Sequence, residues 1–400
     1  MRKNLKYIID RKLCLGCGIC ESLGKNQGYS MYLGSNGFYS VEFPNNRNNI
    51  LEQDILEICP TVNLTVAKSN SVWGDLKSVN YAWSNNDVIR QNGSSGGVIT
   101  AIATYLLEQK EVNAILQVGN TKGSALYNEL KISRNSEEVL ENASSRYAPA
   151  LIFNQITQIL DSTSETYGFV GKPCDIIALK KLITKYPIYT SRIKYFISLF
   201  CAGISSYLGT QVLLKKETGR TEIPLKLKYR GDGWPGNFTA NYKDGFVYKS
   251  TYIDSYGRYL RDYTHFRCKI CPDGIGLSAD IVVGDAWETA NGYTDFDERP
   301  GRSFVIVRNL TGQKLIDKMT NKESITIETL EIDKLSQIQP YQYQRRISVG
   351  YRIYFIHLIF GFIFNLRNSN LIGLMLKYPL KKGIREVLGT AKRLGKINKY

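Results

Sequence analysis

The sequence predicts a multidomain protein that combines the α/β and α+β classes, and three observations lead to this expectation. Between residues 85 and 220, apolar runs such as AILQVG, YGFVG and YFISLFC alternate with helical patterns such as VITAIATYLLEQ, which is typical of βαβ units around a parallel sheet. Half of the eight cysteines lie in the turn-rich first 65 residues. Short Tyr-rich segments interrupted by glycine fill residues 221–340, and they favour hairpins.

These observations divide the chain into four expected segments. They are a small cysteine-rich module over residues 1–65, an α/β domain over 85–220, a mixed domain over 221–340 and a basic helical tail over 341–400. With 400 residues, of which 43% are hydrophobic, the chain is long enough for two or three cores. The run ADIVVGD predicts a further buried strand in the third segment.

The use of cysteine indicates metal chemistry rather than disulfides. The N-terminus, MRKNLKYIIDRKLC, has no apolar region or cleavage site of a secretory signal, so we expect a cytoplasmic protein. In a reducing compartment, eight grouped cysteines are better explained as ligands than as disulfides. The two histidines, His265 and His357, are too far apart for a zinc site of two cysteines and two histidines.

The first four cysteines predict a [4Fe-4S] cluster. Cys14, Cys17 and Cys20 form a C-x2-C-x2-C loop, and Cys59, followed by proline, supplies a distant fourth thiolate, as in ferredoxins. Structural zinc usually takes paired C-x2-C units, so a zinc knot is the weaker alternative. Because 38 residues separate Cys20 from Cys59, we expect an insertion such as a hairpin between them.

The other four cysteines are candidates for a second four-thiolate site. Cys174 and Cys201 each follow a predicted strand, and strand ends at one edge of a sheet converge. Cys268 and Cys271 form a C-x2-C pair in the next segment that could close the site. Buried core cysteines and a zinc ion on the same four thiolates are the alternatives.

Two loops could approach a phosphate or an aromatic ring. One contains Ser94, Ser95, Gly96 and Gly97 and precedes a predicted helix over residues 98–108, where backbone amides favour an anion. The other, at a βα junction, consists of Gly171, Lys172 and Pro173. Glycine and serine are also ordinary turn and capping residues, and Lys172 could be a plain surface charge.

Taken together, the motifs CLGCGIC, SSGG, SSRYAP, VGKPCD, KYRGDGWPG, CKIC and ADIVVGDAW resemble the beta-subunit family of coenzyme F-420 hydrogenases and dehydrogenases over residues 10 to 310. The resemblance implies FAD and two [4Fe-4S] clusters. It matches Ser95, Gly96 and Gly97 to the flavin-side loop, and it matches the second group of four cysteines to the family's cluster ligands. Lys172 and Asp175 stand where the family more often has Thr and Gln, which bears on the substrate bound beside the flavin.

The resemblance therefore predicts a ferredoxin-like [4Fe-4S] module, a βαβ-type flavin domain and a mixed C-terminal segment that closes the second cluster. Electrons would pass from ferredoxin or another electron donor through the clusters to FAD and an organic substrate, such as a glycan precursor in polysaccharide biosynthesis. Tyr147, Asp175 and Arg230 are candidate substrate-side groups, or else structural hydrogen-bonding residues. The alternatives are a subunit that reduces or oxidises coenzyme F-420 and an electron-transfer module without its own substrate.

The positive charge is concentrated at the C-terminus. Of a net charge of +16, residues 341–400 contribute 12 Lys or Arg against one acid, Glu386. The tail has no motif that reads a nucleic-acid groove, so no nucleic-acid partner is expected. The apolar stretch 354–366, with 13 residues, is too short to span a bilayer. It could lie in the surface of the inner face of a membrane, or pack on the core with a solvated basic tail behind it.

Overall fold

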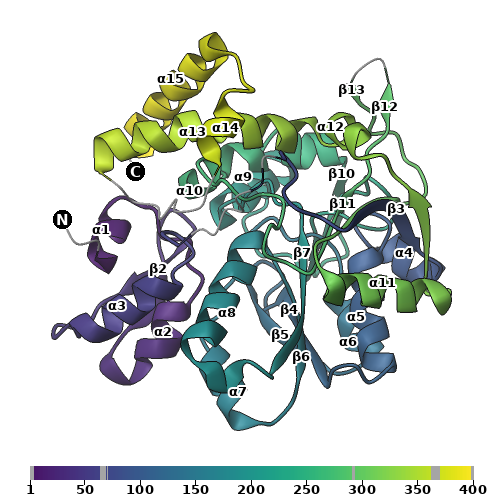
Figure 1. The fold of residues 1–400 in the computed structure, drawn as a ribbon, viewed down its shortest axis with the longest axis horizontal. Coiled ribbons are helices and arrows are strands. Elements are labelled where there is room, and N and C mark those ends of the chain that lie inside the picture. Colours follow the sequence, from purple (N-terminus) through teal and green to yellow (C-terminus); the bar gives the residue numbers. More distant parts are fainter. Residues whose placement is uncertain (1–3, 64–68, 70, 291–292, 362–369, 398–400) are drawn as a thin grey trace.

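The computed structural model describes residues 4–63, 69, 71–290, 293–361 and 370–397, and a mixed eight-stranded sheet forms its centre (Figure 1). In spatial order, its strands are β15 (Ile325–Thr329), β3 (Ser78–Ser84), β14 (Ser303–Val307), β11 (Ile281–Asp285), β7 (Ile193–Leu199), β6 (Tyr167–Gly171), β4 (Ala114–Asn120) and β5 (Asn128–Ser133). Strands β11, β7, β6 and β4 are parallel to one another, and the strands beyond them pair antiparallel. The predicted mixed α/β class and the predicted parallel βαβ units are confirmed.

Helices cover both faces of this sheet because its strands are apolar on both sides. In β4, Ala114 and Leu116 belong to one core, whereas Ile115 belongs to the other, as the alternation of strand side chains requires. One face is covered by α4 (Asp87–Asn92), α5 (Val98–Glu108), α6 (Ser136–Glu141) and α11 (Leu310–Asn321). The opposite face is covered by α7 (Ile156–Ser162) and α8 (Pro173–Lys185).

The N-terminal segment packs against the face that carries α8 (Figure 1). Its elements are α1 (Leu5–Asp10), α2 (Ile19–Gly24), a short 3-10 turn (Lys25–Gln27), β1 (Ser30–Leu33), β2 (Tyr39–Glu42) and α3 (Asn49–Ile58). Asn48 caps α3 by accepting hydrogen bonds from the amides of Ile50 and Leu51. Strands β1 and β2 pair antiparallel, so the hairpin predicted between Cys20 and Cys59 is confirmed.

A smaller sheet forms a separate core beside the main one. Its strands, in spatial order, are β10 (Val247–Ser250), β9 (Phe238–Asn241) and β8 (Lys226–Lys228). They pack on α9 (Tyr207–Thr218) through buried residues such as Leu227, Phe238 and Leu213. The chain then continues through η3 (Ile253–Gly257), η4 (Leu260–Tyr263), α10 (Phe266–Lys269) and the short pair β12 (Thr289–Ala290) and β13 (Tyr293–Thr294). The hairpins predicted after residue 221 are confirmed.

The C-terminal helices close one end of the molecule. They are α12 (Leu335–Ile338), α13 (Pro340–Phe360), α14 (Leu371–Met375) and α15 (Leu380–Ile397). Helix α13 places Val349, Ile353 and Ile356 in the main core. Arg345 and Arg346, which the sequence places among the solvated charges of the tail, are 5% and 2% exposed. The expectation of solvated side chains is wrong for these two residues, because both guanidinium groups are buried and donate hydrogen bonds to backbone carbonyl groups.

The apolar stretch predicted over 354–366 is described only in part. Its first residues continue α13 as far as Phe360, and residues 362–366 lie outside the described residues. Within the part of the chain that the structure describes, none of the helices has both the length and the apolar character that crossing a membrane requires.

Candidate functional site

Four cysteines of the N-terminal segment face one another around the loop before α2. These residues, here called the N-terminal cysteine set, are Cys14, Cys17, Cys20 and Cys59. The loop turns at Gly18, whose φ is +92° and where a Cβ would lie 2.6 Å from the backbone nitrogen of Asn154. Only glycine combines that angle with that contact. The fourth cysteine caps the end of α3, where its amide donates to the carbonyl of Ile55.

Burial and mutual repulsion oppose ionisation of these thiols. The pKa of Cys14 is raised to about 12, first by burial and further by Cys59. The amide of Gly16 donates to the Cys14 sulfur at 3.4 Å and partly opposes this rise. The pKa of Cys20 lies well above its usual value because of burial and the charges of the other three thiols. Four thiolates can therefore coexist here only around a cationic centre.

The other four cysteines gather at the carboxyl edge of the central sheet. This central cysteine set consists of Cys174, Cys201, Cys268 and Cys271, which line one cavity. Cys174 lies in the first turn of α8, just after β6, and Cys201 lies just beyond β7, the parallel neighbour of β6. Helix α10 carries Cys268. Adjacent strand ends and one short helix thus bring together residues that are far apart in sequence.

The central cysteine set has the same electrostatic character. The pKa of Cys201 is raised to about 12, first by burial and then by the neighbouring thiols of Cys268 and Cys271. Burial, followed by the charge of Asp175, raises the pKa of Cys174 well above its usual value. Soft, buried thiol groups that repel one another match the donor set of an iron-sulfur cluster. Both cysteine sets therefore fit such a group by their chemistry.

A single metal ion requires its ligands to lie closer together than the ligands of a [4Fe-4S] cluster do. Among the described residues, no group of three or more His, Cys, Asp or Glu side chains is placed to hold one metal ion. Zinc requires all its ligands within about 2.3 Å of one atom. In a [4Fe-4S] cluster, by contrast, each of the four thiolates binds its own iron atom.

The two cysteine sets are neighbours. Cys17 and Pro60, from the N-terminal segment, line the same cavity as the central cysteine set. The buried guanidinium of Arg267 connects the two regions, since its Nε donates to the carbonyl of Thr61 at 3.2 Å and the residue directly precedes Cys268. The N-terminal cysteine set thus reaches the cavity of the central cysteine set through Cys17.

Lys172 and Asp175 form an ion pair at this boundary. Lys172 Nζ lies 2.6 Å from Asp175 Oδ2, and the backbone amide of Lys172 donates to the same carboxylate. Asp175 contributes to the raised pKa of Cys17 as well as that of Cys174. Lys172 and Pro173 line the cysteine cavity. The loop of Gly171, Lys172 and Pro173, expected beside a phosphate or flavin ring, thus lies at the cysteines.

Tyr147 and Arg230 meet elsewhere, within a group of aromatic side chains. This aromatic cluster consists of Tyr147, Trp234, Tyr252, Tyr256, Trp287 and Phe296. The guanidinium of Arg230 is 4.9 Å from the ring centre of Tyr252 and 5.2 Å from that of Trp287. Its Nη1 lies 3.4 Å from the Tyr147 hydroxyl. Asp175 is therefore separated from the other two candidate substrate-side groups.

Asp285 fixes the orientation of Arg230. The carboxylate accepts two hydrogen bonds from the guanidinium, at 3.0 and 2.8 Å, and a third from Trp234 Nε1 at 2.9 Å. A bidentate pair of this kind holds the cation in one plane. The aromatic cluster also reaches the central cysteine set, because Cys201 is one of the groups that raise the pKa of Tyr256 after burial itself.

The predicted phosphate loop is engaged in contacts with the protein itself. The Ser94 hydroxyl accepts a hydrogen bond from the amide of Ser145 at 2.5 Å. The Ser95 hydroxyl donates to the carbonyl of Arg302, and the amide of Gly96 donates to the Ser303 hydroxyl, both at 2.9 Å. A Cβ at Gly96 would lie 2.7 Å from the carbonyl oxygen of Ala82. Packing against β3 and β14 thus explains Gly96 without a phosphate.

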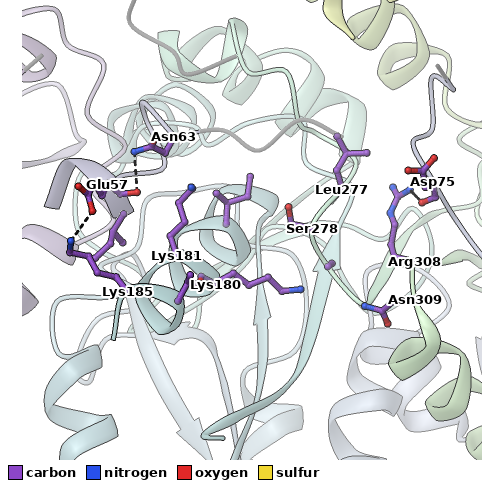
Figure 2. A pocket seen from close by; sticks show the side chains of 14 residues that line it. Glu57, Asn63, Asp75, Lys180, Lys181, Lys185, Leu277, Ser278, Arg308 and Asn309 are labelled. Carbon is purple, nitrogen blue, oxygen red and sulfur yellow. Dashed lines mark hydrogen bonds and ion pairs between the residues drawn. The ribbon is translucent and has the colours of Figure 1, made fainter. Parts of the chain in front are cut away.

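A second cavity, of about 810 Å³, opens beside the N-terminal segment (Figure 2). Lys180 and Lys181 project from α8 into the space between Asn63 on one side and Ser278 on the other (Figure 2). Lys185, on the same helix, pairs with Glu57 at 2.7 Å. The cavity therefore combines lysines with the end of α3, immediately before the cysteine that caps that helix.

Sequence reasoning missed several residues of these sites. Asp285 is the last residue of the predicted strand ADIVVGD, and Trp287 lies two residues beyond it, so the strand-end argument that located Cys201 could have found them too. Arg267 stands beside Cys268 without a motif that distinguishes it. No pattern in the sequence separates Arg345 from the other basic residues of the C-terminus.

Comparisons with known proteins agree with this geometry. The N-terminal model for coenzyme F420 hydrogenase/dehydrogenase beta subunits matches residues 79–157. The C-terminal model for the same subunits matches residues 164–333. These two segments contain the 94–97 loop, the aromatic cluster, Arg230, Asp285 and the central cysteine set, whereas the N-terminal cysteine set and α13 lie outside them.

Individual relatives are named as oxidoreductases or as subunits of oxidoreductases. The chain is 25% identical over 367 residues to the coenzyme F420-dependent sulfite reductase of Methanocaldococcus jannaschii, which covers 86% of this chain and 52% of that protein. It is 28% identical over 267 residues to the coenzyme F420 hydrogenase subunit beta of Methanococcus voltae, covering 65% of this chain and 86% of the subunit. The chain thus spans about half the length of the first of these proteins.

A solved structure has a similar fold. A chain of the F420-reducing [NiFe] hydrogenase complex from Methanosarcina barkeri aligns with a TM-score of 0.54 at 18% identity. The alignment covers 70% of this chain and 94% of that chain. At this identity the likeness concerns the fold alone.

The tight packing of Gly96 leads to a prediction. Gly96→Ala should lower the free energy of unfolding by about 1–3 kcal/mol, because the added Cβ overpacks against the backbone of β3 and β14. Urea unfolding measures the change. Gly389→Ala is the control, since a Cβ there would meet only Arg393, at 3.6 Å, and it should not destabilise the protein. Equal stability of the Gly96 variant and the native protein would contradict the packing account.

Proposed function

Because the chain belongs to the family of coenzyme F420 hydrogenase/dehydrogenase beta subunits, we propose that it is a redox subunit that transfers electrons between two [4Fe-4S] clusters and coenzyme F420. The observation that carries the proposal is the single cavity lined by the central cysteine set together with Cys17. The names of the relatives favour coenzyme F420, the alternative in the sequence analysis, over the expected organic or glycan-precursor substrate.

The two cysteine sets would each hold one cluster, which supplies one-electron storage when bound. The ferredoxin-like role of the N-terminal cysteine set rests on its C-x2-C-x2-C spacing and its fourth cysteine at the end of α3. The protein contributes burial, the amide of Gly16 directed at a sulfur, and the cations of Arg267 and Lys172 beside the thiols. These groups offset the cost of burying negative charge.

The aromatic cluster is the proposed site where a flavin ring, FAD, or the deazaflavin ring of coenzyme F420 is positioned. Tyr147, Tyr252 and Trp287 are half-buried, so part of each ring surface is available for stacking. Arg230 is held beside them by its ion pair with Asp285, and this pair would fix the polar surroundings of the ring. A flavin converts single electrons into a two-electron transfer, whereas the protein orients the ring.

This arrangement assigns the three candidate substrate-side residues to two different places. Tyr147 would contact the ring or the substrate directly, whereas Arg230, which is buried, would act through Tyr147 and the aromatic rings that it touches. Asp175 would act instead at the cysteines, where it pairs with Lys172 and its charge acts on one thiol of each set. The phosphate role of the 94–97 loop stays a prediction, and only groups of that loop that are not already hydrogen-bonded could serve it.

The subunit needs an electron donor, a ferredoxin or another acidic carrier, and the lysine-bearing cavity is its proposed docking site. Lys181 extends beside the end of α3, close to the N-terminal cysteine set, whereas Lys180 points away from α3 and pairs with Asp280 at 3.6 Å. Opposite charge on a carrier would raise the rate of encounter and orient it toward the nearer cluster.

Cysteine variants test the two-cluster proposal. Anaerobically purified Cys17→Ser and Cys268→Ser should each retain about half of the iron and acid-labile sulfide, because each removes a ligand from a different set. Reduction of coenzyme F420 by an artificial donor, followed by the absorbance of the deazaflavin, should fall at least about 100-fold in Cys268→Ser. Full iron content in either variant would contradict the assignment. A protein with both clusters that never reduces coenzyme F420 would be an electron-transfer module without its own substrate.

The docking proposal predicts an effect of charge reversal. Lys181→Glu should slow reduction by an acidic ferredoxin by about tenfold at low salt and weaken the dependence of that rate on salt. Lys216→Glu is the control, because Lys216 is exposed on α9 and lies outside the cavity, and it should leave the rate unchanged. If both reversals slow the reaction equally, only the overall charge matters and the cavity is not the docking site.

We also propose that the C-terminal helices touch an anionic membrane surface. Leu380, Ile384 and Leu388, spaced four residues apart on α15, are 67%, 52% and 63% exposed, and this spacing places them on one face of the helix. Lys381 and Arg385 border that face. Each basic residue near acidic lipid contributes about 1 kcal/mol of attraction, in addition to the burial of apolar side chains.

Co-sedimentation with vesicles measures this association. The intact protein should sediment with phosphatidylglycerol vesicles at low salt, and replacing Leu380, Ile384 and Leu388 by serine should release it. Neutral phosphatidylcholine vesicles are the control. If the intact protein stays in the supernatant with acidic vesicles at low salt, the membrane proposal is wrong.

A further inference from the structure

Helix α13 places a buried arginine on the backbone of the central cysteine set. Arg345 is 5% exposed. Its Nη1 donates to the carbonyl of Cys201 at 2.8 Å, its Nη2 to that of Cys268 at 3.0 Å and its Nε to that of Cys271 at 3.2 Å. One side chain thus joins three of the four cysteines, which come from two separate parts of the sequence.

Neighbouring residues leave space for Arg345 and share its hydrogen-bond acceptor. Gln342, one turn earlier on α13, donates to the same Cys201 carbonyl at 3.0 Å. Gly274 lies beneath both side chains, and a Cβ there would come within 2.6 Å of Gln342 Oε1 and 2.8 Å of Arg345 Nη1. A larger residue at position 274 would displace the contact. Helix α13 lies beyond residue 333, where the family match ends.

The charge of Arg345 also acts on the nearby thiols. Cys271, Cys201 and Cys268 are among its main electrostatic partners, together with Tyr341. Two other cations line this cavity: Lys172 is paired with Asp175 at 2.6 Å, and Arg267 donates to the carbonyl of Thr61 in the N-terminal segment. Arg345 thus carries a positive charge that acts on three thiols of the central cysteine set and hydrogen-bonds the backbone of the same three cysteines.

We propose that Arg345 is a positioning residue for the [4Fe-4S] cluster of the central cysteine set, holding three ligand segments in place and raising the reduction potential of the cluster by its fixed positive charge. This inference rests on the proposed function. Reduction adds negative charge to the site, and a buried cation stabilises the more negative state more strongly. An arginine suits the role because its planar fork offers five donors that can reach several carbonyls at once, which a lysine cannot do.

Three variants separate positioning from charge. Arg345→Gln removes the charge and part of the fork, Arg345→Lys keeps the charge but loses the fork, and Arg192→Gln is the matched control. Arg192 also binds three oxygen acceptors, of Glu165, Leu160 and Thr163, near α7 and the start of β6. The readouts, on anaerobically purified protein, are the midpoint potential of each cluster and the rate of iron loss to a chelator. Comparison with Cys17→Ser identifies the signal of the central cluster.

In Arg345→Gln, the central cluster should become about tenfold harder to reduce, a shift of about 59 mV to more negative potential, and it should lose iron about tenfold faster. The other cluster should keep its potential. Arg345→Lys should lose iron faster while its potential stays near the native value, and this variant decides the positioning role if Arg345→Gln does not fold. Arg192→Gln should match the native protein in both readouts.

Two results overturn the inference, and they are distinguishable. Native protein with about eight irons per chain, but Arg345 variants that match it in potential and iron loss, refutes the role of Arg345 alone. Native protein with only about four irons, retained in Cys268→Ser, refutes the proposed function of the central cysteine set together with the inference.

Discussion

Electrostatic repulsion among buried thiolates is the constraint on which the arrangement of this protein depends. Eight thiol groups are gathered in two sets, and for most of them burial and neighbouring thiols raise the pKa. Such sets are favourable only when positive charge enters with them. The proposed iron supplies most of it. Arg267, Lys172 and Arg345 supply the remainder from fixed positions of the fold. In this account the clusters organise the surrounding polar side chains as much as the fold organises the clusters.

The central sheet determines where these groups meet. The parallel strands β6, β7 and β11 end at one edge, and the residues that follow them include Cys174, Cys201 and Trp287. The N-terminal cysteine set approaches this edge from one side, and the aromatic cluster extends from it on the other. Helix α13 closes the edge from the C-terminal end of the chain (Figure 1). The N-terminal cysteine set, the central cysteine set and the aromatic cluster therefore follow one another in space. This order suits the proposed transfer of electrons toward a ring-shaped carrier.

Much of this could be predicted from the sequence, because local patterns specified it. The apolar runs predicted β4, β6, β7 and β11, and the glycines and serines before residue 98 predicted the start of α5. The convergence of strand ends at one edge of a sheet correctly predicted that Cys174 and Cys201 lie close together. Long-range packing explains what could not be predicted. Arg345 was counted as a tail charge because nothing in its neighbourhood indicates burial, and Asp175 was grouped with Arg230 although the fold directs it to the cysteines. Position 96 is glycine because a side chain there would clash with Ala82 and Ser303, and no local motif reveals this contact.

The central claim is that the two cysteine sets hold adjacent clusters on one electron path. Electron paramagnetic resonance during stepwise reduction tests it most directly, because neighbouring paramagnetic centres split and broaden each other's signals. The account predicts that the signal of the first cluster to be reduced changes shape when the second is reduced, and that this change is absent in Cys17→Ser. Two signals that add without any interaction, or one signal only, would contradict it.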